Sequence, residues 1–201
     1  TNATYQSDTA AAAQYVTKDG IQSYESLGWM NGYYMYVEVP EDVDVIEIGY
    51  RHTGYDTFVA GSFKCNDEFY NTLWQKSADT LLVTMRDNYM DCPDRERAQW
   101  WGDAVNEFQE AFYSLSRSSD LLTKKGIHNI IDWKRPDDVL LTVAPCSSVF
   151  ELPVQVLAGI TGYYTYYEYT GDYDTLAYAY PDAVKYLKLF NIGSDGVIEH
   201  R

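Results

Sequence analysis

The stretch DEFYNTLWQKSADTLLVTM (residues 67–85) marks the point where the hydrophobic pattern takes on a helical period. Asp67 is a favourable N-cap residue, and Glu68 follows it in the first turn. The residues that recur at the spacing of one helix face are Phe69, Leu73, Trp74, Ser77, Leu81 and Met85. The stretch therefore predicts an amphipathic helix.

Four further helices are expected downstream, at about residues 103–116, 120–133, 150–169 and 175–190. Asp120 is a candidate cap for the second of these four, and Pro181 is expected to disturb the first turns of the last. Five consecutive helices with short connections indicate a helical bundle or toroid.

The pattern upstream of this helical part is different. The runs GYYMYVEVP (residues 32–40) and VDVIEIGYRHTGYDTFV (residues 43–59) alternate at a period of two and are rich in Val, Ile and Tyr. A turn at residues 40–42 separates them. We expect two or three antiparallel strands between residues 29 and 63. Because so few strands make a poor domain by themselves, we assign them to the last part of a β-sandwich, with a boundary near residue 60.

Charge and composition narrow the classes of partner. The 201 residues carry 30 acidic and 15 basic side chains, for a formal net charge of −15. This balance argues against binding to nucleic acid and to anionic membranes, both of which need a basic face. The 20 Tyr, 5 Trp and 7 Phe residues indicate either an aromatic core or a surface for neutral, hydroxyl-rich ligands.

The three cysteines, at positions 65, 92 and 146, are odd in number and widely spaced, so they predict no disulfide framework. We expect no metal site and no cofactor, because no His/Cys spacing suggests zinc and nothing spells a calcium loop. No apolar run is long enough to span a membrane. The cysteine count favours no compartment firmly, and we favour a periplasmic or secreted location over the cytoplasm.

The densest cluster of functional groups is DCPDRERAQWWGD (residues 91–103), in the connection between the first two helices. Cleavage of a glycosidic bond requires two carboxyl groups, charged partners for sugar hydroxyls and aromatic faces for the ring. This segment contains all of these residue types, and a carboxyl beside a Trp has a raised pKa, as a general acid needs. A solvated, salt-bridged loop packed over its Trp residues would have the same composition.

The longer string DCPDRERAQWWGDA resembles the signature of bacterial α-L-rhamnosidases, glycoside hydrolase family seventy-eight. The similarity covers about residues 29–190, and the motif at residues 91–103 is its most specific part. The resemblance implies inverting hydrolysis of terminal α-L-rhamnosides by an (α/α)6 barrel that follows β-sandwich modules. It also implies a rhamnose-containing carbohydrate as the substrate.

The resemblance implies a role for each residue of the motif. Glu96 is similar to the general acid of the family, and Asp91 and Asp103 are similar to carboxylates that bind the rhamnose hydroxyls. Arg95 is similar to a neighbouring residue that contacts the sugar or orients the acid. Trp100 or Trp101 is similar to the residue that forms an aromatic wall of the sugar subsite. Cys92 and Pro93 are similar to residues that shape the turn.

The chain departs from the family pattern in two places. Gln99-Trp100-Trp101 stands where the family usually has Gly-Trp before its Gly-Asp, which affects where the aromatic wall lies. The region SSVFELPVQ (residues 147–155) stands where the family often has Trp-Gly-Asp-Ala. Glu151 is therefore either a substrate-binding acid or simply an acid near a helix N-terminus.

The chain provides about five helices, whereas the family barrel has six helical hairpins and takes its general base from the later half. We therefore expect a mainly α chain that is a piece of a longer protein, because it starts with Thr1 and stops after a turn-like GSDG. Residues 1–60 would be the C-terminal part of a β-sandwich module with its linker, and residues 61–201 the N-terminal part of the catalytic domain. This piece would carry the acid half of the site, would have little activity alone and would self-associate through exposed helix faces.

Two other functions stay open. One is a different (α/α)6 glycosidase, such as a fucosidase-like or unsaturated-glycuronyl hydrolase. The other is a carbohydrate-binding module that holds sugar without cleaving it.

Overall fold

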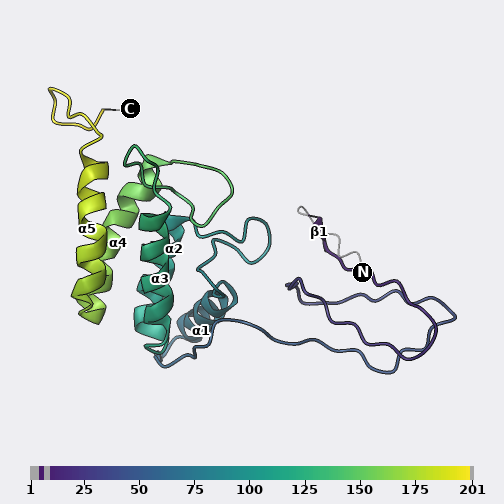
Figure 1. The fold of residues 1–201 in the computed structure, drawn as a ribbon. Coiled ribbons are helices and arrows are strands. Elements are labelled where there is room, and N and C mark those ends of the chain that lie inside the picture. Colours follow the sequence, from purple (N-terminus) through teal and green to yellow (C-terminus); the bar gives the residue numbers. More distant parts are fainter. Residues whose placement is uncertain (1–4, 7–9, 200–201) are drawn as a thin grey trace. The chain divides into compact units, whose positions relative to one another are not determined.

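The computed structural model describes residues 5–6 and 10–199 of the chain (Figure 1). The chain separates into two compact units, one comprising Thr1–His52 with Pro93–Arg95 and the other Thr53–Cys92 with Glu96–Arg201. The five helices of the described residues belong to the second unit, and they confirm the mainly α prediction. They are α1 (Glu68–Val83), α2 (Trp101–Ser114), α3 (Ser119–Asp132), α4 (Pro153–Thr170) and α5 (Tyr173–Leu187).

Local residue chemistry explains where these helices begin. The Asp67 carboxylate accepts a hydrogen bond from the Phe69 amide at 2.9 Å, as expected for an N-cap. The helix α4 begins at Pro153 rather than near residue 150, because a Pro has no amide hydrogen to lose in the first turn. Asp120 lies in the first turn of α3, where the cap position belongs to Ser118 instead. Pro181 lies inside α5, which continues to Leu187.

The core of the second unit lies where α2, α3, α4 and α5 pack side by side (Figure 1). Two glycines on α4 allow it to approach α2 closely. A Cβ at Gly159 would overlap the indole ring of Trp101, and a Cβ at Gly162 would lie 2.7 Å from a methyl carbon of Val105. The largest completely buried side chains include Trp101, Tyr89, Tyr186 and Phe108. Aromatic side chains therefore fill the core, as the composition allows.

The strands expected between residues 29 and 63 are not present in this structure, all of which is described over that range. The turn after Pro40 is confirmed, since the Val43 amide donates to the Pro40 carbonyl oxygen at 3.1 Å. The flanking runs nevertheless form no strand, although Val59, at the end of the second run, makes an isolated antiparallel bridge with Leu115. Tyr34 and Ile46 are 85% and 80% exposed. An alternating pattern predicts which side chains share a face, but a strand forms only against a hydrogen-bonding partner.

The strands within the described residues lie near the N-terminus instead. β1 (Tyr5–Gln6) and β2 (Ala10–Ala11) pair antiparallel, with Tyr5 opposite Ala11. Among the described residues, no helix has both the length and the apolar composition that crossing a membrane requires. The three cysteines of the chain are free.

Candidate functional site

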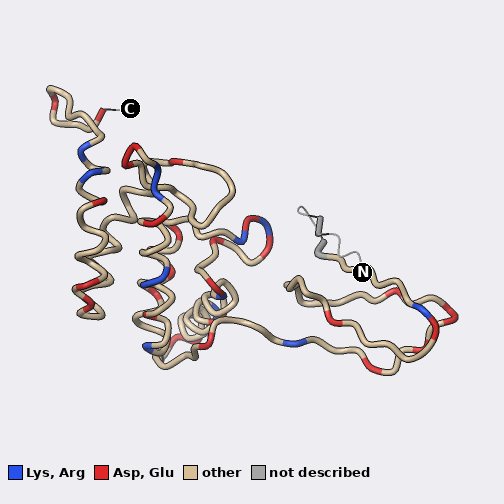
Figure 2. Tube along the Cα trace, in the orientation of Figure 1, with Lys and Arg blue, Asp and Glu red and all other residues tan. Residues whose placement is uncertain are grey.

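The candidate site lies in the loop that joins α1 to α2. Basic and acidic residues follow each other closely along this loop (Figure 2). Its start is tied to α1, because the Met90 amide donates to the Thr84 carbonyl oxygen at 2.9 Å. Its end is tied to the segment before α4, because the Trp101 amide donates to the Thr142 carbonyl oxygen at 2.8 Å. Both ends of the loop are therefore fixed to helical parts of the second unit.

The structure brings together Asp91 and Glu96, two of the acids that the sequence predicts for the site. One oxygen from each carboxylate and the Cys92 sulfur all lie within 4.8 Å of one another. The Cys92 thiol donates a hydrogen bond to Glu96 Oε2, with 3.3 Å between sulfur and oxygen. Glu96 is exposed to solvent, whereas Asp91 and Cys92 are partly buried. Because Glu96 is exposed and its two neighbours are partly buried, the Glu96 carboxyl is accessible to a substrate.

Asp91 holds a proton more readily than an ordinary aspartate. Burial raises its pKa, the hydrogen bond from the Ala98 amide opposes this, and the neighbouring Glu96 carboxyl raises it further. The two carboxyls lie closer together than the roughly 6.5–9.5 Å that an inverting glycosidase needs between its acid and its base. This separation is too short for Asp91 and Glu96 to serve together as an inverting acid–base pair.

The same three groups are the residues that could hold a metal ion in this site. Two carboxylates and a thiolate suit a divalent cation such as zinc. Cys92 and Glu96 are also close enough for the hydrogen bond between them. The expectation of a site without metal remains a prediction.

Asp103 is positioned by a side chain from α4. Gln155 Nε2 donates to Asp103 Oδ2 at 3.2 Å, and Gln155 Oε1 accepts from the Gly102 amide at 2.6 Å. Gly102 permits this approach, because a Cβ at that position would collide with the Gln155 amide. The first turn of α2, which carries Asp103, is therefore held in register with α4.

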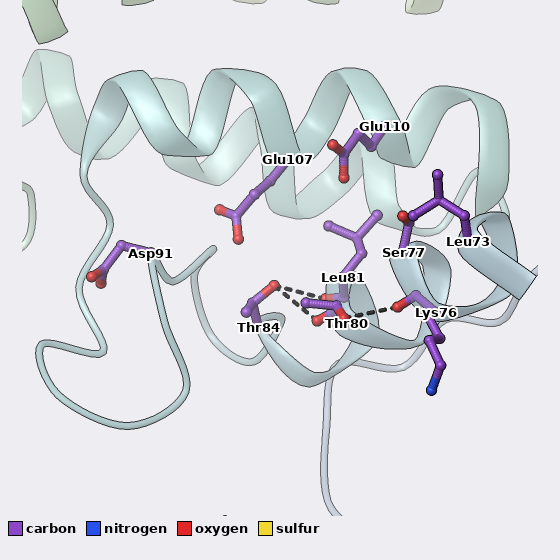
Figure 3. A pocket seen from close by; sticks show the side chains of 9 residues that line it. All are labelled: Leu73, Lys76, Ser77, Thr80, Leu81, Thr84, Asp91, Glu107 and Glu110. Atoms are coloured by element: carbon purple, nitrogen blue, oxygen red, sulfur yellow. Dashed lines mark hydrogen bonds between the residues drawn. The ribbon is translucent and has the colours of Figure 1, made fainter. Parts of the chain in front are cut away.

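A cavity of about 410 Å³ opens beside the site, between α1 and α2 (Figure 3). It is lined by Thr84, Asp91, Glu107 and Glu110, and by residues of α1 between positions 73 and 81. Glu107 and Glu110 project from α2 into this space (Figure 3). The cavity therefore connects the candidate catalytic loop to a second group of acids.

Glu107 is an acid of this region that sequence reasoning missed. Burial raises its pKa to about 8, and the nearby charges of Asp103 and Asp91 add to this, while a hydrogen bond with Thr84 opposes it. Within the described residues, its Oε2 atom is buried without a hydrogen-bond partner. The sequence does contain a signal for Glu107: it lies four residues after Asp103, and residues four apart share a helix face.

The structure separates the two tryptophans that were candidates for the aromatic wall. Trp101 is completely buried and packs against Tyr163 and Phe108, with ring centres 5.7 Å and 6.0 Å away. In this structure it belongs to the core, and its assignment to the aromatic wall remains a prediction. Trp100 is partly exposed and lies edge-to-face with Phe150 at 5.8 Å. Trp100 is therefore the better candidate.

Glu151 and Arg95, the other two residues predicted for the site, lie outside the Asp91–Cys92–Glu96 cluster. Glu151 precedes α4, and its Oε1 atom accepts a hydrogen bond at 2.7 Å from the hydroxyl of Tyr186, a buried residue of α5. Arg95 belongs, with Pro93 and Asp94, to the unit that contains Thr1–His52. The roles assigned to Glu151 and Arg95 remain predictions.

Comparison with known proteins identifies the family of this helical unit. Residues 59–197 match the family described as the bacterial alpha-L-rhamnosidase six-hairpin glycosidase domain. The chain belongs to this family. The match includes the whole motif at residues 91–103, so the resemblance that the motif suggested is confirmed.

A curated α-L-rhamnosidase of Formosa agariphila is 31% identical over 106 residues. The similarity covers 50% of this chain and 11% of that rhamnosidase. The chain therefore spans only a small part of the length of its relative.

Solved rhamnosidase structures share the fold. A rhamnosidase of glycoside hydrolase family seventy-eight from Bacillus sp. GL1 has 25% identity and a TM-score of 0.65, over 72% of this chain and 15% of that one. The α-L-rhamnosidase from Dictyoglumus thermophilum has 26% identity and a TM-score of 0.60, over 66% and 15%. A rhamnosidase from Klebsiella oxytoca with rhamnose bound has 17% identity and a TM-score of 0.62, over 72% and 29%. At that identity, the last match supports the fold alone.

Proposed function

We propose that Asp91, Glu96 and Asp103 form the acid side of the active site of an inverting α-L-rhamnosidase. The substrate would be a glycoside or polysaccharide with terminal α-L-rhamnose. The observation that carries this proposal is the clustering of Glu96 with Asp91 and Cys92 in a loop of a rhamnosidase-family domain.

Glu96 is the general acid in this proposal. Its exposed carboxyl would donate a proton to the glycosidic oxygen as the bond to the anomeric carbon breaks. Asp91 and Asp103 would accept hydrogen bonds from the sugar hydroxyls, since both carboxylates are held in place by other groups. Trp100 would contact the ring, and Arg95 and Glu151 would contact other parts of the substrate.

The general base in this proposal lies outside the 201 residues. Inversion requires a carboxylate that activates water on the opposite face of the sugar. Asp91 lies too close to Glu96 for that role. The base would take one proton from the attacking water, the water oxygen would bond to the anomeric carbon, and the aglycone would leave with the proton from Glu96.

Hydrolysis of p-nitrophenyl α-L-rhamnopyranoside tests this proposal. The 201-residue chain is compared with a longer natural polypeptide that completes the six-hairpin domain. We expect turnover by the longer form alone, and a loss of about 10²–10⁴-fold in Glu96→Gln. Glu168→Gln, at an exposed position on α4, is the matched control and should retain activity.

Three results would overturn the proposal or a part of it. Full activity of Glu96→Gln in the longer form would show that Glu96 is not the acid. No cleavage by either form, together with binding of rhamnose, would favour a sugar-binding module instead. Activity of the 201-residue chain alone would place the base within it, and Glu151 would be the first residue to test.

A further inference from the structure

We propose that Cys92 is a positioning residue for Glu96, holding its carboxyl in one orientation beside Asp91. This inference rests on the proposed role of Glu96 as the general acid. It assigns to the cysteine a task beyond shaping the turn.

The donor end of the Cys92–Glu96 contact is firmly held. The preceding residue, Asp91, bonds to Ala98 through both its amide and its carboxylate, each at 3.0 Å. The following residue is Pro93, whose ring fixes its own backbone angle φ and restricts the residue before it. The Cys92 thiol is therefore presented from a backbone with little freedom.

The acceptor end of the contact is the Glu96 carboxyl, which the neighbouring Asp91 carboxyl also contacts. Glu96 is exposed, and a glutamate side chain loses considerable rotamer freedom when it is fixed in one place. The thiol lies 3.3 Å from Glu96 Oε2, a normal length for a hydrogen bond to sulfur. A bond from a fixed donor selects the rotamers of Glu96 that keep its carboxyl near Asp91.

The other two thiols of the chain provide a contrast. Cys65 donates to the Asp67 backbone carbonyl oxygen at 3.2 Å, and Cys146 donates to that of Val143 at 3.1 Å. Neither of these two bonds is made to a carboxylate. Cys146→Ala is therefore a matched control for the loss of a thiol hydrogen bond.

The first test measures activity in the longer polypeptide. We expect Cys92→Ala to lower kcat about tenfold with little change in KM, because an unoriented acid still binds substrate but seldom donates. Cys92→Ser keeps a donor and should recover most of the loss, and Cys146→Ala should be as active as the wild type. Equal activity of Cys92→Ala and wild type, or equal losses in Cys92→Ser and Cys92→Ala, would refute the positioning role.

The second test needs no activity and uses the 201-residue chain. In a Cys65→Ser/Cys146→Ser background, infrared spectroscopy detects the S–H stretching band of Cys92 alone. We expect the band to shift in Glu96→Ala at neutral pH, because the thiol loses the Glu96 acceptor and keeps only the neighbouring Asp91 carboxyl. The band should stay in place in Glu168→Gln. An unmoved band in Glu96→Ala would show that the hydrogen bond is absent. A moved band with full activity of Glu96→Gln would refute the proposed acid and leave the contact intact.

Discussion

Asp91 and Ala98 hydrogen-bond to each other twice and so close the loop that carries Glu96. The Asp91 amide donates to the Ala98 carbonyl oxygen, and the Ala98 amide donates to Asp91 Oδ1, both at 3.0 Å. Asp91 therefore has two tasks in this account: it closes the loop, and its carboxylate would also bind the sugar. The order of the loop and the order of the site depend on the same residue.

Replacement of Asp91 separates these two tasks. Asp91→Ala removes the acceptor of the Ala98 amide, so we expect that amide to exchange with solvent about tenfold faster than in the wild type. Asp91→Asn keeps an acceptor oxygen and should stay close to the wild-type rate. Amide hydrogen exchange measured by NMR checks this, and unchanged protection in Asp91→Ala would contradict it.

The stability of the helical unit should fall as pH rises, because of Glu107. Its pKa is 4.5 for an ordinary glutamate and about 8 in the fold. Between these values the unfolded chain releases a proton that the folded chain retains, so the free energy of unfolding decreases by up to about 1.4 kcal/mol per pH unit. Glu107→Gln should flatten this loss between about pH 5 and about pH 8. Urea unfolding measures it, with Glu168→Gln as the control. An equally steep loss in Glu107→Gln would refute the assignment.

Close packing of α4 on α2 depends on Gly159. A Cβ at this position would overlap the buried Trp101 ring, so Gly159→Ala should destabilise the fold by about 1–3 kcal/mol. The exposed Thr161, on the same helix, provides a control in Thr161→Ala, for which we expect a much smaller change. Thermal unfolding compares the two, and similar melting temperatures for both variants would contradict this packing.

Asp172 stabilises the start of α5 as a charged cap. Burial disfavours its charge, but its hydrogen bonds with the Lys124 ammonium and with Thr175 outweigh this and hold its pKa well below the ordinary value. A carboxyl of this kind contributes stability above its unfolded pKa, and the contribution is lost as pH falls. Asp172→Asn should therefore lower the free energy of unfolding by about 1 kcal/mol at neutral pH. The difference between this variant and the wild type should become smaller as the pH falls. Asp174→Asn is the control, and a difference independent of pH would oppose this account.

Sequence periodicity located the five helices because each one buries a single face. The Asp67 cap and the Pro153 start could both be anticipated or explained from local chemistry alone. The absence of strands between residues 29 and 63 could not be anticipated, because alternation does not reveal whether a pairing partner is present.

The site was predictable to the extent that it is local. Asp91 and Glu96 meet because a short loop joins them. The burial of Trp101 depends on Gly159, and the pKa of Glu107 depends on α1 across the cavity. Both effects arise from elements that meet only in the folded chain, so no spacing within the motif reveals them.

The most direct test of the central claim is the dependence of Glu96→Ala on the leaving group, measured in the longer polypeptide. A rhamnoside with a poor alkyl leaving group needs a proton from the acid, whereas a dinitrophenyl rhamnoside leaves without one. We predict that Glu96→Ala loses at least about a hundredfold in kcat/KM on the alkyl rhamnoside and far less on the dinitrophenyl rhamnoside. Equal losses on both substrates would contradict the account, because they would show that Glu96 donates no proton in the reaction.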